Sequence, residues 1–131
     1  MPTNNKTCFA PQLFIRAGVT NIEFYQKAFG AIELRRFLND DESYHVAELS
    51  IDGALFHLHE EKPQADELSP GNINGTTTLI GLFVSDVDAV MSQAIAAGAT
   101  LISPAQSYDY GYRQGRVKDP FGHHWMIEMS I

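Results

Sequence analysis

Residues 115–128 read GRVKDPFGHHWMIE, and this stretch decides the fold. A short polar strand leads into the segment DPFG at 119–122. Because Pro120 has a fixed φ and Gly122 can adopt a positive φ, the segment predicts a tight turn between antiparallel strands. The chain then leaves as a strand over 123–130, in which apolar and polar side chains alternate. One face of this strand is therefore expected to pack under a helix, and the opposite face to present His124, Met126 and Glu128 to a ligand.

The rest of the chain repeats one pattern twice. In each half we expect a strand, a helix that ends at a glycine (Gly30, then Gly98), and three further strands. The predicted strands cover residues 9–16, 32–38, 44–51 and 54–60, then 76–84, 99–103, 114–118 and 123–130. Capping boxes are predicted at Thr20 with Glu23 and at Ser85 with Asp88.

This repeat predicts an α+β fold of two βαβββ modules in a single domain, 1–131. The first module covers 9–60 and the second 76–131, with a linker or mobile loop at 61–75 and a further loop at 104–113. Because one module alone leaves a sheet face uncovered, the two should associate into a curved, mostly antiparallel cup with the helices outside.

Composition narrows the class of protein. The chain has 131 residues, 44% of them hydrophobic and 19% charged, and a net charge of −7. This composition predicts a globular domain and disfavours nonspecific binding to nucleic acid, which needs a basic surface. The single cysteine, Cys8, excludes an internal disulfide and fits a cytoplasmic location. No apolar run has the length of a signal peptide or a membrane span, so neither is expected.

Strand alternation predicts which side chains face the cup. Gln12 and Phe14 share one face of the first strand, and His57 and His59 share one face of the fourth. Together with Glu48, His124 and Glu128, these residues allow two interpretations. The first is a metal site, because imidazoles and carboxylates suit Zn, Ni, Fe or Mn. The second is a polar cup for an organic ligand, or histidines that hydrogen-bond to the backbone and to water.

Residues 108–113 offer further candidates. Tyr108, Tyr110 and Tyr112 alternate around Gly111 and can either stack on a ligand or pack within their loop. Arg113 and Arg116 can pair with an anionic ligand or with surface acids.

The two modules, the helix-closing segments FYQKAFG at 24–30 and AGA at 97–99, and DPFG followed by HHW resemble the vicinal oxygen chelate superfamily of glyoxalases, bleomycin-resistance proteins and extradiol dioxygenases. The resemblance covers essentially the whole chain and is closest to the glyoxalase-like branch ending in DPFGHxW. In its metal-dependent members, the first and last strands of each module supply four metal ligands. The corresponding positions here are Ala10, His57, Leu79 and Met126. Only His57 is a plausible ligand, although His59 or Glu128 would substitute after a register shift.

The resemblance implies a homodimer that binds a small molecule, while the acidic charge and the lack of a long apolar run predict no nucleic-acid or membrane partner. Our leading hypothesis is a ligand-binding protein of the glyoxalase/bleomycin-resistance type without a metal cofactor. It predicts ligand contacts from Gln12, Phe14, His57, His59, Tyr108, Tyr110, Arg113, His124 and Glu128. The alternative is a metal-dependent lyase or dioxygenase with a nonstandard site, in which His57 and Glu128 hold the metal and Glu48 or Glu128 moves a proton.

Overall fold

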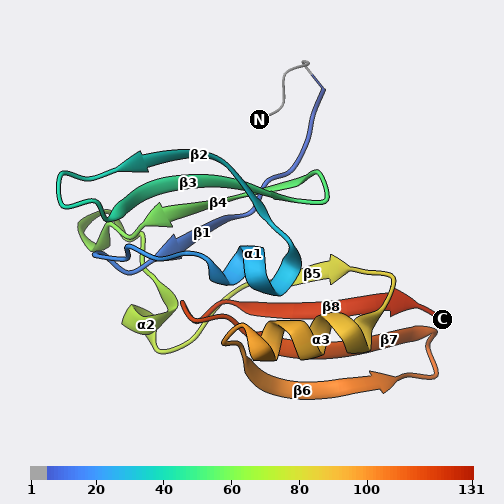
Figure 1. Ribbon diagram of the computed structural model, residues 1–131. Helices are drawn as coiled ribbons and strands as arrows, with labels where there is room; N and C mark the ends of the chain where they lie inside the picture. Colours follow the sequence, from blue (N-terminus) through green and yellow to red (C-terminus); the bar gives the residue numbers. More distant parts are fainter. Residues whose placement is uncertain (1–5) are drawn as a thin grey trace.

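The computed structural model describes residues 6–131 (Figure 1). Two four-stranded sheets, each accompanied by one principal helix, confirm the predicted α+β fold of two βαβββ modules. The elements are β1 (Gln12–Ile15), α1 (Phe24–Phe29), β2 (Ile32–Leu38), β3 (Tyr44–Ile51), β4 (Ala54–Glu60), η1 (Pro63–Ala65), α2 (Pro70–Ile73), β5 (Leu79–Phe83), α3 (Val87–Ala96), β6 (Thr100–Ser107), β7 (Tyr112–Lys118) and β8 (His124–Ser130).

Both sheets have the same topology. The N-terminal sheet has the order β1-β4-β3-β2, and the C-terminal sheet has the order β5-β8-β7-β6. In each, the first and last strands of the module pair in parallel and all other pairs are antiparallel. The equivalence of β1 with β5 and of β4 with β8 is what the internal sequence repeat predicted.

One hydrophobic core joins the two modules. Phe56 of β4 and Trp125 of β8 lie with their rings 5.7 Å apart, and Tyr25 of α1 contacts both rings. Helices α1 and α3 also contact each other (Figure 1). The helix-facing sides of both sheets therefore contribute to the same core. On each sheet we call the opposite side the open face.

The helix starts differ from the predicted capping boxes. The N-cap of α1 is Glu23, and its backbone N–H donates to Oδ1 of Asn21 at 2.8 Å, so Thr20 is not the cap. The N-cap of α3 is Asp86, whose Oδ1 accepts a hydrogen bond from the N–H of Ala89 at 3.1 Å. In both helices the accepting side chain belongs to the residue that follows the predicted cap: Asn21 follows Thr20, and Asp86 follows Ser85. Both side chains are short enough for their oxygen to reach a backbone N–H at the start of the helix.

The predicted loop over 104–113 is largely strand. β6 continues to Ser107, and only residues 108–111 connect it to β7. Pro104 is tolerated because β6 is an edge strand whose register shifts between Ser103 and Gln106. At the other end of the chain, β1 begins at Gln12, so the strand predicted from residue 9 is shorter than expected.

The stretch 61–75, predicted as a loop, contains the short helices η1 and α2. Oε1 of Glu61 accepts hydrogen bonds from the backbone of Ser69 at 2.9 Å and from the amide of Asn72 at 2.7 Å. Pro70 is buried beside Gly122, so this stretch packs on the DPFG turn. Within residues 6–131, no helix has the length and apolarity needed to span a membrane.

Candidate ligand-binding site

The open face of the N-terminal sheet carries the predicted histidines. Across β1, β4 and β3, Gln12 pairs with His57, which pairs with Glu48. One step along, Phe14 pairs with His59. The imidazole rings of His57 and His59 are stacked with centroids 5.8 Å apart, and the ring of Phe14 meets that of His59 edge-on at 6.3 Å. Alternation thus places the predicted residues together on one face.

Two buried atoms on this face have no hydrogen-bond partner within residues 6–131. One is Oε1 of Glu48, a residue only 7% exposed, and the other is Nε2 of His59. Nε of Arg35 lies 3.8 Å from the Glu48 oxygen, which is an ion-pair contact but too long for a hydrogen bond. Buried polar atoms are nearly always partnered in native proteins, so these two mark a place where a partner is expected.

Burial lowers the pKa of His59 below its ordinary value, and the neighbouring His57 lowers it further. The carboxylates of Glu67 and Glu48 act in the opposite direction and do not reverse the shift. The lowered pKa favours the neutral imidazole of His59, whose Nε2 is either a donor or an acceptor, depending on the tautomer.

The open face of the C-terminal sheet is built around Glu128, which is 8% exposed. Its Oε1 accepts a hydrogen bond of 2.7 Å from the side-chain amide of Gln114 on β7. The carbonyl of the same amide accepts a hydrogen bond from the hydroxyl of Tyr110. A chain of hydrogen bonds thus connects the 108–111 loop to a buried carboxylate.

A row of contacting aromatic rings lies at the same end of this sheet. Tyr108 and Tyr110 stack with centroids 5.2 Å apart, and Tyr112 meets Tyr110 at 6.1 Å and Phe83 at 5.9 Å. Phe83 on β5 is the register partner of Glu128 and is 60% exposed. The sequence pointed to the tyrosines, but Phe83 and Gln114 were missed because only strand pairing brings them to Glu128.

Toward the DPFG turn, this face carries His124, Met126 and Arg116. Burial lowers the pKa of His124, and the positive charges of Arg116 and Lys118 lower it further. The adjacent His123 is directed elsewhere, because its Nε2 lies 2.7 Å from the backbone oxygen of Phe14. Of the two neighbouring histidines, only His124 belongs to the open face.

Two residues that could be expected on the open faces, Arg113 and Tyr44, lie instead on the helix-facing sides of their sheets. Arg113, predicted to contact ligand, forms a two-point ion pair with Asp88 of α3, with both N–O distances 2.8 Å. Tyr44, which strict alternation from Val46 and Glu48 would place on the open face, instead packs toward α1. A register shift between Phe37 and Leu38 reverses the side on which the start of β3 presents its side chains.

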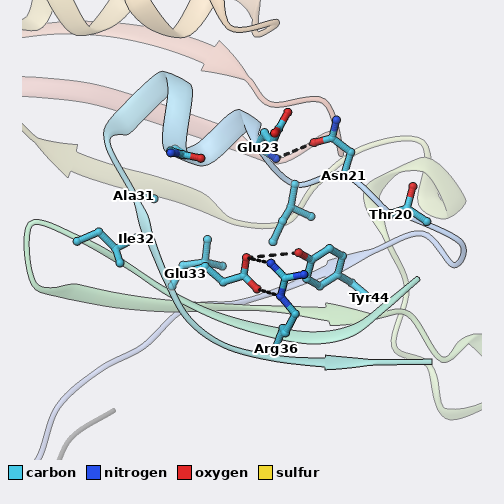
Figure 2. A pocket seen from close by; sticks show the side chains of 11 residues that line it. Thr20, Asn21, Glu23, Ala31, Ile32, Glu33, Arg36 and Tyr44 are labelled. Atoms are coloured by element: carbon cyan, nitrogen blue, oxygen red, sulfur yellow. Dashed lines mark hydrogen bonds and ion pairs between the residues drawn. The ribbon is translucent and has the colours of Figure 1, made fainter. Parts of the chain in front are cut away.

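Tyr44 lines a pocket of ≈ 620 Å³ between α1 and strands β2 and β3 (Figure 2). There Glu33 receives two hydrogen bonds from Arg36 and one from the hydroxyl of Tyr44. Its central charged groups, Glu33 and Arg36, are paired with each other, and none of the residues predicted to contact a ligand lines it. We therefore do not regard this pocket as the functional site.

The predicted residues consequently form two separate half-sites. His57, His59 and Glu48 lie on one open face, while His124 and Glu128 lie on another, and the shared core lies between the two modules. Within residues 6–131, no three His, Cys, Asp or Glu side chains are close enough together to hold a metal ion.

Comparisons with known proteins agree with this architecture. An uncharacterized protein of Mycobacterium bovis is 37% identical over 134 residues, covering 100% of this chain and 88% of the relative. Among solved structures, TioX from Micromonospora superposes with a TM-score of 0.70 at 23% identity, covering 95% of this chain and 100% of that one. The fosfomycin resistance protein FosX from Listeria monocytogenes superposes with a TM-score of 0.70 at 17% identity, covering 96% and 94%.

The model of the Glyoxalase/Bleomycin resistance protein/Dioxygenase superfamily matches residues 14–127, nearly the whole described chain. This match confirms the resemblance drawn from the DPFG turn and the internal repeat. The chain belongs to the Glyoxalase/Bleomycin resistance protein/Dioxygenase superfamily.

Proposed function

We propose that this protein binds a small organic molecule on the open faces of its sheets, without the family's usual metal site. The observation that carries the proposal is the pair of buried, unpartnered atoms, Oε1 of Glu48 and Nε2 of His59. Leaving a buried polar group without a partner costs about 1–3 kcal/mol. A ligand that hydrogen-bonds to these atoms would recover that energy on binding.

The surroundings of these atoms suit an organic ligand. Phe14 stands edge-on to His59, and Phe37 of β2 contributes a ring that is 43% exposed. A site that combines apolar walls with a few directed polar groups is typical of small-molecule recognition. The Glu48 carboxylate can only accept hydrogen bonds, so the ligand would present a donor to it.

The proposal includes a homodimer. Each open face is a half-site that exposes apolar side chains, namely Ile32 and Phe37 on the N-terminal sheet and Leu79 and Phe83 on the C-terminal sheet. Exposed apolar side chains on two complementary surfaces favour association with a second copy. In such a dimer the N-terminal sheet of one chain and the C-terminal sheet of the other would enclose the ligand together.

The side chains at the family's four metal-ligand positions support the proposal that the protein binds its ligand without a metal. Leu79 cannot ligate a metal, and Met126 offers only a thioether, which is a poor ligand for hard divalent ions. His57 would be the only ligand at the four positions that metal-dependent members use.

A metal-dependent lyase or dioxygenase remains the second candidate function. Two stacked imidazoles, His57 and His59, share one face with Glu48, and imidazole and carboxylate donors suit Zn, Ni, Fe or Mn. Because no three such side chains within residues 6–131 are close enough together to hold a metal ion, a metal here would need a further ligand from a substrate or a second chain. In that case the metal would polarise a substrate oxygen when bound, and Glu48 would move a proton at the substrate.

The proposed function is tested by a thermal-stability screen of organic compounds that carry positive, neutral or negative groups. Compounds that stabilise the wild-type protein are then titrated calorimetrically into His59→Gln and into His45→Gln, a matched change at an exposed histidine on β3. We expect His59→Gln to weaken binding by about tenfold and His45→Gln to leave it unchanged. If no compound binds, or if both variants bind equally well, the proposal is wrong.

A further inference from the structure

Glu128 is a buried carboxylate that meets no counter-charge in the described part of the chain. Among the same residues, its one hydrogen bond from a side chain comes from the neutral amide of Gln114. Within residues 6–131, no Lys, Arg or His nitrogen lies within 4.0 Å of its oxygens. A buried charge is expensive unless it is paired, so a cation is the partner that would most stabilise this site.

The second oxygen of Glu128 occupies a recess that glycine creates. A Cβ at position 81 would lie 2.6 Å from Oε2 of Glu128, far closer than real contacts allow. Gly81 is on β5, two residues before Phe83 and on the same face of the strand. Its φ is not positive, so the backbone conformation does not require a glycine at this position. The absence of a side chain at residue 81 therefore lets Oε2 lie against the strand.

The rings next to this carboxylate are suited to a cation with an apolar body. Phe83 is opposite Glu128 in register and is mostly exposed, and Tyr112 stands edge-on to it. Aromatic faces attract ammonium and guanidinium groups, and the attraction increases near a carboxylate in a desolvated site. An anionic group would be repelled by Glu128, and a neutral donor would gain a hydrogen bond but no pairing of charges.

Arg116 is the cation nearest in register on the same face. It pairs with Met126, one alternation from the Gln114–Glu128 pair, and makes no ion pair with Glu128. Its charge acts on His124, at the end of the face near the DPFG turn. Positive charge is thus kept away from the aromatic end of the face.

We propose that Glu128 binds the positively charged nitrogen of an organic cation, whose apolar body lies against Phe83 and Tyr112. This inference rests on the proposed function, because it takes an open sheet face as the ligand surface. It adds the chemical class of the ligand: a substituted ammonium or guanidinium compound with an apolar or aromatic body.

The experiment uses three benzyl or phenyl probes that differ in charge: benzyltrimethylammonium, benzyl alcohol and benzoate. Each is titrated into the full chain and followed by NMR shifts of the backbone amides of β5 and β8. We expect benzyltrimethylammonium to bind about tenfold more tightly than either of the other probes, with shifts centred on residues 81–83 and 126–128. Equal affinity for the three probes, or no binding of the cation, would overturn the inference.

Variants identify the group responsible. Glu128→Gln keeps the shape and the hydrogen bond from Gln114 and removes only the charge, so affinity for the cation should fall about tenfold. Phe83→Leu, a change at an exposed side chain, should also weaken binding. Arg116→Gln is the matched control and should leave affinity unchanged or raise it. Unaltered cation affinity in Glu128→Gln contradicts the proposal. If Glu128→Gln does not fold, the cation affinity of Phe83→Leu decides instead, and an unaltered affinity in that variant contradicts the proposal.

This test and the screen described above fail in different ways. If neutral or anionic compounds bind and depend on His59 while the cation does not bind, the ligand class is wrong and the binding function stands. If nothing in the screen binds, the binding function itself is wrong.

Discussion

The hydroxyl of Tyr25 donates a 2.6 Å hydrogen bond to Oδ2 of Asp119, although 94 residues separate the two along the chain. The same oxygen accepts a hydrogen bond from the indole of Trp125 at 3.0 Å. Oδ1 accepts from the backbone N–H groups of Phe121 and His123. Burial raises the pKa of Tyr25 well above its ordinary value, and the charge of Asp119 raises it further. One carboxylate therefore fixes the DPFG turn and ties it to α1 of the other module.

Replacing Asp119 by alanine should lower the free energy of unfolding by about 3 kcal/mol or more, because several buried donors lose their acceptor. Tyr25→Phe removes one donor to a charged acceptor and should cost about 1.5–3 kcal/mol. Urea unfolding measures both. The control is Asp88→Asn, at a 61% exposed side chain, where less than about 1 kcal/mol is expected. Comparable losses in all three variants would show that Asp119 has no special role.

Gly122 is expected to tolerate alanine less well than Gly53. Both have a positive φ, +94° and +87° respectively, which costs a non-glycine residue about 1–3 kcal/mol. At residue 122 an added Cβ would also lie 2.7 Å from Cβ of Pro70, whereas at residue 53 it meets nothing within 4 Å. The difference between the two unfolding free energies isolates the contact with Pro70. Equal losses would mean that this contact relaxes freely.

Stability should fall between pH 7 and pH 5 partly because of His59. Its pKa is lowered in the folded protein by burial and by His57, so the unfolded chain binds the proton more tightly. The stabilising contribution is therefore complete above the unfolded pKa of about 6.5 and is lost as the pH falls through the folded pKa. His59→Asn should reduce the pH dependence of urea unfolding in this range. An unchanged slope would show that His59 titrates alike in both states.

Adding Zn²⁺ or Mn²⁺ should produce no tight, stoichiometric binding. The only imidazole at the family's four ligand positions is His57, and a single neutral ligand holds a divalent ion weakly. Calorimetric titration and elemental analysis of the purified protein measure this directly. Tight binding that His57→Ala abolishes would instead support the metal-dependent enzyme.

Arg113→Gln should change stability by less than about 1 kcal/mol, because its partner Asp88 is largely exposed. It should leave the affinity for every compound found in the screen unchanged, since the side chain is on the helix-facing side of β7. A loss of ligand affinity in this variant would mean that Arg113 exchanges Asp88 for the ligand.

The sequence determined the two modules, because strand and helix periodicities and glycine stops are local properties of the chain. It also predicted that His57 and His59 share a face, since alternation along β4 requires this. The register of strand pairing was harder to predict from the sequence. The shift between β2 and β3 that turns Tyr44 toward α1 depends on how the two strands pair, and the residues around Tyr44 do not determine that pairing.

Only the tertiary structure decided how the two modules meet. The periodicity of β4 and β8 placed Phe56 and Trp125 on helix-facing sides, but their 5.7 Å contact arises from the packing of α1 between modules far apart in sequence. That contact makes the two helix-facing sides one core and leaves His57 and Glu128 on separate open faces. The reason is physical: alternation fixes the side of a strand on which a residue lies, whereas the distance between faces depends on long-range burial of apolar surface.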